Sequence, residues 1–202
     1  MCGFAEGYDR LRELLPGPFT YSGFDYADEI VNTMRRNRPE LDIRHQDATR
    51  FSAPAEYDLV LLISGLHHLH DRAGDVVQRL AAALRPGGLF LSFEPTHGNR
   101  LTRLVRERIY LRNPVFEAAT ERAFAVDELA GFFTAAGLRC RHMFHPGLLA
   151  YILYYTPDAF PQLNRGGAPA VRAAFALDGL FMDNVIGRLL SFATFSIWEK
   201  PA

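Results

Sequence analysis

The feature that most constrains the fold is a run of apolar residues, YDLVLLIS, at residues 57–64. A continuous apolar run of this length, as opposed to an alternating one, is typical of a strand buried on both faces of a parallel sheet. Parallel strands need a crossover connection between them, which is usually a helix. The run therefore predicts an α/β fold if strands and helices alternate around it.

Expected strands and helices alternate through the first half of the chain. Four strands are expected, at residues 21–25, 41–46, 57–64 and 89–93, and three helices, at residues 8–15, 27–37 and 75–84. Turn sequences such as Pro86-Gly87-Gly88 separate these elements. We predict a doubly wound, mostly parallel sheet of the Rossmann-like type, with ligands beyond the carboxyl ends of its strands.

Composition narrows the class of protein. Hydrophobic residues make up 49% of the 202 residues and charged residues 22%, which is enough for a packed core. The formal net charge of −1 argues against a nucleic-acid partner. The two cysteines suit a reducing compartment, and no apolar run has the length of a membrane-spanning helix. A cytoplasmic protein without an integral membrane segment is expected.

The distribution of basic residues excludes several chemistries. Lys200 is the only lysine among 22 basic residues. A phosphate-binding loop that ends in Gly-Lys-Ser/Thr, Schiff-base catalysis and the Tyr-x-x-x-Lys pair of short-chain dehydrogenases all need an interior lysine. These chemistries are therefore excluded.

Three features surround the expected carboxyl edge of the sheet. The glycine-containing loop CGFAEG, residues 2–7, precedes the first helix, Asp25 ends the next strand, and Asp47 follows the third. A carboxylate at the position of Asp25 can accept hydrogen bonds from both hydroxyls of a ribose, although capping a helix is an equal alternative. The loop lacks the full G-x-G-x-x-G spacing, and Glu6 would lie poorly beside a pyrophosphate. NAD and FAD are therefore disfavoured, and with them a nicotinamide oxidoreductase.

The ordered set resembles the class I S-adenosylmethionine-dependent methyltransferases of the small-molecule type. The motifs that carry the resemblance are, in order, CGFAEG, GFDYADEIV, HQDATRF, YDLVLLISGLHHLHD and LRPGGLFLSFEP. Fainter similarity follows in ERAFAVDELAGFFTAAGLRCRHMF and FATFSIWEKP, which resemble the family's late helix with its sixth strand and its seventh strand. The resemblance implies S-adenosyl-L-methionine as cofactor. The implied cofactor-binding residues are Cys2, Gly3, Phe4, Ala5, Asp25, Tyr26, Asp47, Ala48, Ser64 and Gly65.

One departure from the family concerns the start of the chain. The family's glycine loop follows an apolar first strand, whereas here Met1 stands where that strand should be ending. We expect the first strand and the helices before it to be missing. A variant that never had the strand would leave two neighbouring strands with unpaired backbone groups.

Histidines supply the candidates for a catalytic base. Methyl transfer from a sulfonium is an in-line displacement, and a base is needed only when the acceptor is a hydroxyl or a similar acid. His67, His68 and His97 follow the fourth and fifth strands of the resembled fold and are the candidates, with loop packing or helix capping as the alternative. His142 and His145 are expected to be structural. No tight ligand spacing indicates a metal site, and none is predicted.

The second half of the chain is expected to complete a single domain, residues 1–202. A cofactor-binding core over residues 1–143 is followed by an aromatic-rich helical insertion over residues 144–189 and a final strand within residues 190–202. The insertion is interpreted equally as a lid over an apolar or aromatic acceptor and as a flap that packs on the sheet or in a homodimer. Arginines at positions 100, 103, 106, 108 and 112 are expected on a solvated helix surface or, less so, at an anionic ligand.

These observations favour a methyltransferase that acts on a small, apolar or aromatic molecule. The histidines at the sheet edge slightly favour O-methylation over N- or C-methylation. The alternative is a non-catalytic, methyltransferase-like binding or partner subunit with an incomplete cofactor pocket.

Overall fold

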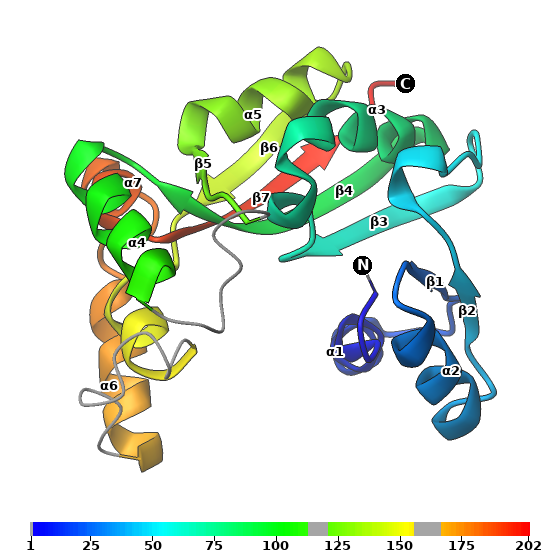
Figure 1. Cartoon of the computed structure of the whole chain (residues 1–202), viewed down its shortest axis with the longest axis horizontal. Helices are drawn as coiled ribbons and strands as arrows, with labels where there is room; N and C mark the ends of the chain where they lie inside the picture. Colours follow the sequence, from blue (N-terminus) through cyan, green and yellow to red (C-terminus); the bar gives the residue numbers. More distant parts are fainter. Residues whose placement is uncertain (1, 113–120, 156–166) are drawn as a thin grey trace.

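The computed structural model describes residues 2–112, 121–155 and 167–202. Helices and strands alternate along the chain, as Figure 1 shows. In order, the elements are α1 (Glu6–Leu14), β1 (Ser22–Asp25), α2 (Asp28–Asn37), β2 (Asp42–His45), η1 (Ala48–Arg50), β3 (Tyr57–Ile63), η2 (Leu66–Arg72), α3 (Ala73–Ala83), β4 (Leu84–His97), α4 (Arg100–Arg112), β5 (Phe124–Ala125), α5 (Val126–Ala135), β6 (Arg139–Phe144), η3 (Tyr151–Tyr155), α6 (Gly167–Asp178), α7 (Val185–Leu190) and β7 (Ala193–Glu199).

The larger of two sheets has the strand order β3-β4-β7-β6, and β5 pairs with the end of β4. β3 and β5 run parallel to β4, whereas β7 is antiparallel to both β4 and β6. β4 is longer than the predicted strand at residues 89–93, since it continues through Glu94 to His97. The continuation is paired on both sides, by β7 at Pro95 and by β5 at Thr96.

The main core lies between this sheet and the helices α3 and α5, which contact each other and cover one face of the sheet (Figure 1). α3 buries Val76, Val77 and Leu80 at the spacing that places residues on one face of a helix. Phe133 of α5 stacks on Trp198 of β7, with ring centroids 4.9 Å apart. Each such large side chain stabilises the fold by about 1.5–3 kcal/mol through burial alone.

The first two strands form a separate parallel sheet, β1-β2. Helix α2 covers it and buries Val31 and Met34 against Ile43 of β2 and Ala5 of the loop before α1. This unit lies beside the β3 end of the larger sheet (Figure 1). The hydroxyls of Ser22 and Tyr57 are 3.0 Å apart across the junction between the two sheets.

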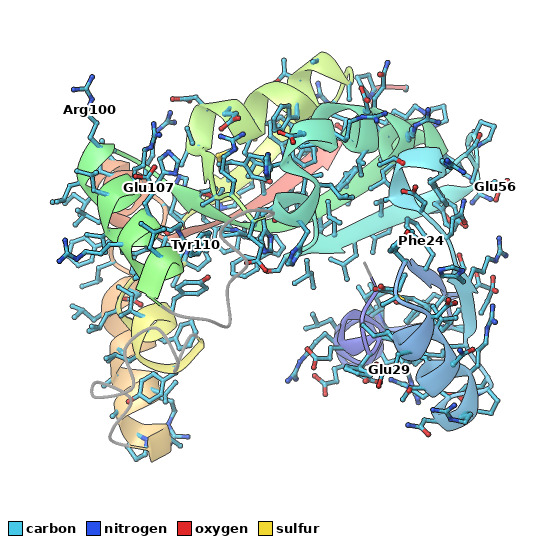
Figure 2. All side chains as sticks on the ribbon, in the orientation of Figure 1. Phe24, Glu29, Glu56, Arg100, Glu107 and Tyr110 are labelled. Carbon is cyan, nitrogen blue, oxygen red and sulfur yellow. The ribbon has the colours of Figure 1, made fainter. Side chains whose placement is uncertain are left out.

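β3 is the end strand of the larger sheet, and the prediction that it is buried on both faces is wrong. Leu62 is its only buried residue, and Ile63 is 41% exposed. The reason is that β3 pairs with β4 alone, because no strand of the described residues lies between β3 and β1. The ring of Phe24 in β1, labelled in Figure 2, instead stacks at 4.9 Å on Phe51, which belongs to the main core.

The described helices of the predicted insertion are η3, α6 and α7, and residues 179–184 form turns between α6 and α7. Phe160, an aromatic residue of the predicted insertion, lies outside the described residues. None of the described helices is both long and apolar enough to cross a membrane. The predicted Rossmann-like α/β fold is confirmed, and the division of the chain at residues 143 and 189 stays a prediction.

Candidate functional site

Asp25 and the glycine loop meet at the carboxyl end of β1. The backbone N–H groups of Gly3 and Ala27 donate to the two carboxylate oxygens of Asp25, each at 3.1 Å. Burial acts to raise the pKa of Asp25, but the hydrogen bonds that its carboxylate accepts outweigh burial and keep the pKa below the ordinary value. Gly3 has a positive φ of 51°, and a Cβ added to it would meet nothing within 4 Å. The loop therefore presents open backbone beside an ionised carboxylate.

Asp47 lies at the same edge, because β2 is parallel to β1. The N–H of Gln46 donates to the carbonyl of Asp25 at 2.9 Å, which brings Asp47 beside the first site residue. The Asp47 carboxylate caps η1, accepting from the N–H and from the hydroxyl of Thr49, both at 2.8 Å. These bonds lower the pKa of Asp47. Its neighbour Ala48 is buried.

The other predicted cofactor-binding residues near β1 and β2 differ in how far their side chains are exposed to solvent. Phe4 is 56% exposed and Tyr26 72% exposed, so both rings can reach a ligand. Ala5 is fully buried and has a left-handed backbone, which leaves its side chain no room to line a site. Cys2 donates its N–H to the carbonyl of Phe24 at 2.9 Å, and burial raises the pKa of its thiol.

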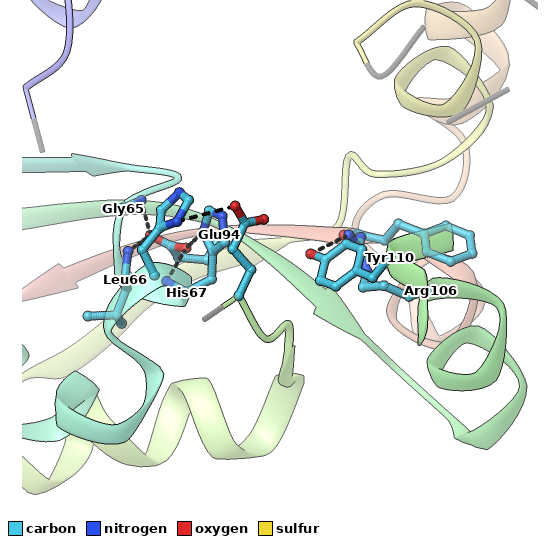
Figure 3. Close-up of polar contacts among 9 residues, drawn as sticks. Gly65, Leu66, His67, Glu94, Arg106 and Tyr110 are labelled. Atoms are coloured by element: carbon cyan, nitrogen blue, oxygen red, sulfur yellow. Dashed lines mark hydrogen bonds and ion pairs between the residues drawn. The ribbon is translucent and has the colours of Figure 1, made fainter. Parts of the chain in front are cut away.

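The loop after β3 is organised by a residue that the sequence analysis missed, Glu94. This side chain is fully buried and accepts hydrogen bonds from the backbone N–H groups of Gly65 at 2.9 Å, Leu66 at 2.8 Å and His67 at 3.3 Å (Figure 3). A signal was present in the sequence, since Glu94 is an acid directly after the apolar run LFLSF. Ser64 begins the loop with a positive φ of 49°.

The three candidate histidines lie on two neighbouring strand ends. His67 is buried, and its Nδ1 lies 3.0 Å from the Glu94 carboxylate (Figure 3). His68 is more exposed, with its ring centroid 4.1 Å from that of His67. His97 ends β4, and burial together with the positive charges of Arg103 and Arg106 lowers its pKa. A lowered pKa keeps the His97 imidazole neutral near pH 7, which a general base requires.

The two histidines that were expected to be structural lie in β6 and directly after it. His142 pairs with Asp183 at 3.0 Å on an exposed part of β6. His145 is buried, with Nδ1 3.1 Å from the hydroxyl of Thr194. A cavity of about 640 Å³ lies between α5 and β6, and none of the predicted site residues lines it.

The arginines of α4 divide between surface and interior. Arg100 points away from the protein (Figure 2), and Arg103 pairs with Glu107 at 2.7 Å. Arg106 is buried, and here the expectation of a solvated surface is wrong. Its guanidinium donates to the carbonyl of Phe192 and to the hydroxyl of Tyr110 (Figure 3), because α4 packs against the start of β7.

Comparison with known protein families gives a match over the first part of the chain. Residues 1–88 match the family model described as a methyltransferase domain. The match covers 88 of the 202 residues and agrees with the resemblance to the class I S-adenosylmethionine-dependent methyltransferases. The matched part of the chain contains the glycine loop, Asp25, Asp47 and the loop after β3. No curated protein sequence matches the chain.

Solved structures of low sequence identity share the fold of this chain. A putative methyltransferase from Bacillus halodurans has a TM-score of 0.66 at 14% identity, over 100% of this chain and 90% of that one. A putative sarcosine dimethylglycine methyltransferase from Galdieria sulphuraria has a TM-score of 0.69 at 11% identity, over 99% and 76%. The cyclopropane synthase MmaA2 from Mycobacterium tuberculosis has a TM-score of 0.67 at 14% identity, over 98% and 75%.

Proposed function

We propose that the chain binds S-adenosylmethionine at the carboxyl ends of β1, β2 and β3 and transfers its methyl group to a small acceptor. The observation that carries the proposal is the juxtaposition of Asp25 with the open backbone of Gly3, and with Asp47 one strand away. An ionised carboxylate with a lowered pKa is suited to accept hydrogen bonds from a ribose. A backbone without a Cβ lets a ligand approach closely.

In this proposal each side chain has a part in holding the nucleoside. Asp25 accepts from the ribose hydroxyls, Tyr26 packs on the adenine, and Asp47 with Ala48 reads the adenine edge. The glycine loop, Cys2 to Ala5, lines the methionine part, with Ala5 contributing backbone only. Ser64 and Gly65 close the site beside the sulfonium, held in position by Glu94.

Methyl transfer then requires alignment of the acceptor more than activation of the methyl group. The bound cofactor supplies a methyl group on a sulfonium, which is already a good leaving group. The chain has to align the acceptor in line with that bond and to exclude water. For a hydroxyl acceptor we propose His97 as the first candidate for the base, because burial lowers its pKa, with His67 and His68 as the others.

We further propose that the acceptor is small and apolar or aromatic and that the protein is cytoplasmic. Aromatic side chains of the insertion support the first part: Tyr151 and Tyr154 are half-buried, and the ring of Tyr151 lies 6.2 Å from that of Phe93 in β4. Phe93 is adjacent to Glu94, which links the insertion to the proposed site.

The insertion also supports a homodimer. α6 and the turn after it expose Phe175, Leu177 and Leu180, the last at 68%. Exposed apolar side chains mark an interface where they form one patch. Sedimentation equilibrium of the chain and of a Leu180→Glu variant tests this: a dimer that dissociates in the variant supports the interface, and a monomeric chain contradicts it.

A non-catalytic binding subunit is the second candidate, and the observation that favours it is the separation of the β1-β2 sheet from β3. Isothermal titration calorimetry with S-adenosylhomocysteine, and with NAD⁺ for comparison, separates the two candidates. Saturable binding of the first ligand alone supports the methyltransferase. Absence of binding supports the subunit.

A further inference from the structure

Two histidines and a glutamate meet beside the loop after β3. His67 and His68 are consecutive residues of η2, and Glu121 arrives from the segment before β5. One potential ligand atom from each of the three lies within 4.8 Å of the others. The N–H of Arg122 donates to the carbonyl of His67 at 3.3 Å, which fixes the Glu121 segment against η2.

The spacing of these atoms is close to that of a coordination sphere. Bonds from Zn²⁺ to nitrogen and oxygen are about 2.0–2.2 Å, so tetrahedral ligand atoms lie about 3.4 Å apart. Nδ1 of His68 and Oε1 of Glu121 are already 3.5 Å apart. Binding of an ion then requires the three ligand atoms, which lie within 4.8 Å of one another, to move closer together.

The orientation of the His67 ring is fixed by the carboxylate of Glu94. Its Nδ1 lies 3.0 Å from the buried carboxylate of Glu94, which can only accept a hydrogen bond, so Nδ1 carries the proton. The unprotonated Nε2 is left for another ligand. A carboxylate that holds the far nitrogen of a histidine is the usual support of a metal-bound imidazole.

The charges of the site favour a cation. Glu94 is fully buried, and the Glu121 side chain is 11% exposed. Within the described residues both carboxylates pair with histidines and with no arginine or lysine, since Arg122 pairs with Glu128. Two poorly solvated carboxylates without a fixed positive charge carry a desolvation cost of several kcal/mol, which a divalent ion offsets.

We propose that His67, His68 and Glu121 bind one divalent first-row transition-metal ion of the Zn²⁺ type, with Glu94 as the positioning residue of His67. Two imidazoles and one carboxylate leave a coordination position open, as in catalytic rather than structural zinc sites. A metal on Nε2 of His67 prevents this nitrogen from acting as a general base and leaves His97 unaffected. The site escaped sequence analysis because Glu121 is distant from the histidines along the chain.

The test uses Co²⁺ as a coloured substitute for Zn²⁺ on the whole chain, after treatment with a chelator and without cofactor. We expect one equivalent of Co²⁺ to give visible absorption bands of low-coordinate cobalt, and Zn²⁺ to abolish them. His68→Ala and Glu121→Gln should remove the saturable signal. Glu94→Gln should weaken Co²⁺ binding about 10–100-fold, as expected when the support of a ligand is lost.

His70→Ala is the matched control, because His70 lies in the same η2 and pairs with Asp71 instead. Circular dichroism establishes that each variant is folded before it is titrated. Retention of the cobalt bands in His70→Ala supports the site. Equal Co²⁺ binding in all variants, or only the spectrum of hydrated Co²⁺, overturns the proposed metal site. This result does not depend on whether S-adenosylmethionine binds.

Discussion

Glu94 holds His67 by two bonds at once, to the backbone N–H at 3.3 Å and to Nδ1 at 3.0 Å. With the N–H groups of Gly65 and Leu66, the carboxylate satisfies three consecutive backbone donors of a buried turn. The position of the loop after β3 therefore depends on one side chain of the neighbouring strand.

Replacement of this carboxylate should be strongly destabilising. We expect Glu94→Ala to lower the free energy of unfolding by about 3 kcal/mol or more, because several buried donors lose their acceptor together. Urea denaturation monitored by circular dichroism measures the change. Glu29→Ala, which removes an exposed acid of α2, should stay within about 0.5 kcal/mol of the unaltered chain. Similar stabilities of the two variants would show that Glu94 does not organise the loop.

Two glycine substitutions should have opposite effects on stability. A Cβ on Gly98 would lie 1.9 Å from the carbonyl oxygen of Arg188, whereas a Cβ on Gly131 meets nothing within 4 Å. Gly98→Ala should therefore cost about 1–3 kcal/mol by forcing α7 away from the end of β4. Gly131→Ala, inside α5, should stabilise the chain by about 0.5–1 kcal/mol. Thermal melts that rank the two variants in the reverse order would contradict this packing.

The stability of the fold should decrease as the pH falls, because His145 is buried in its neutral form. Burial, with the charge of Arg188, lowers the pKa of His145 below its ordinary value of 6.5. The unfolded chain therefore takes up this proton first, so the contribution to stability is complete above pH 6.5 and is lost as the pH falls below it. His145→Gln should flatten the fall of stability between about pH 7.5 and 5.5. The exposed His142→Gln serves as the control, and an equal pH slope in both variants would contradict the assignment.

Local pattern was sufficient to predict the alternating elements and the resemblance of residues 1–88 to a methyltransferase domain. α2, with Val31 and Met34 on one face, and the glycine loop before α1 could be read from their own sequences. The partial exposure of β3 could not be predicted, because burial depends on which strands lie beside it. Glu94 and Arg106 were missed for the same reason: their partners, the loop after β3 and the carbonyl of Phe192, are distant in sequence.

The candidate site could likewise be predicted only in part. Asp25 and Asp47 were located by their positions after strands, and the structure brings them to one sheet edge. Glu121 is distant in sequence from the two histidines that it meets, so no local pattern predicts their proximity.

The central claim is that Asp25 and its neighbours bind S-adenosylmethionine, and calorimetric titration with S-adenosylhomocysteine tests it most directly. Asp42→Ala, which alters an exposed acid of β2 paired with Arg44, is the control. We predict saturable one-to-one binding by the unaltered chain, an unchanged dissociation constant for Asp42→Ala, and a loss of about 1–3 kcal/mol of binding free energy for Asp25→Ala. Absence of binding by the unaltered chain, or an equal dissociation constant for Asp25→Ala, would contradict the account.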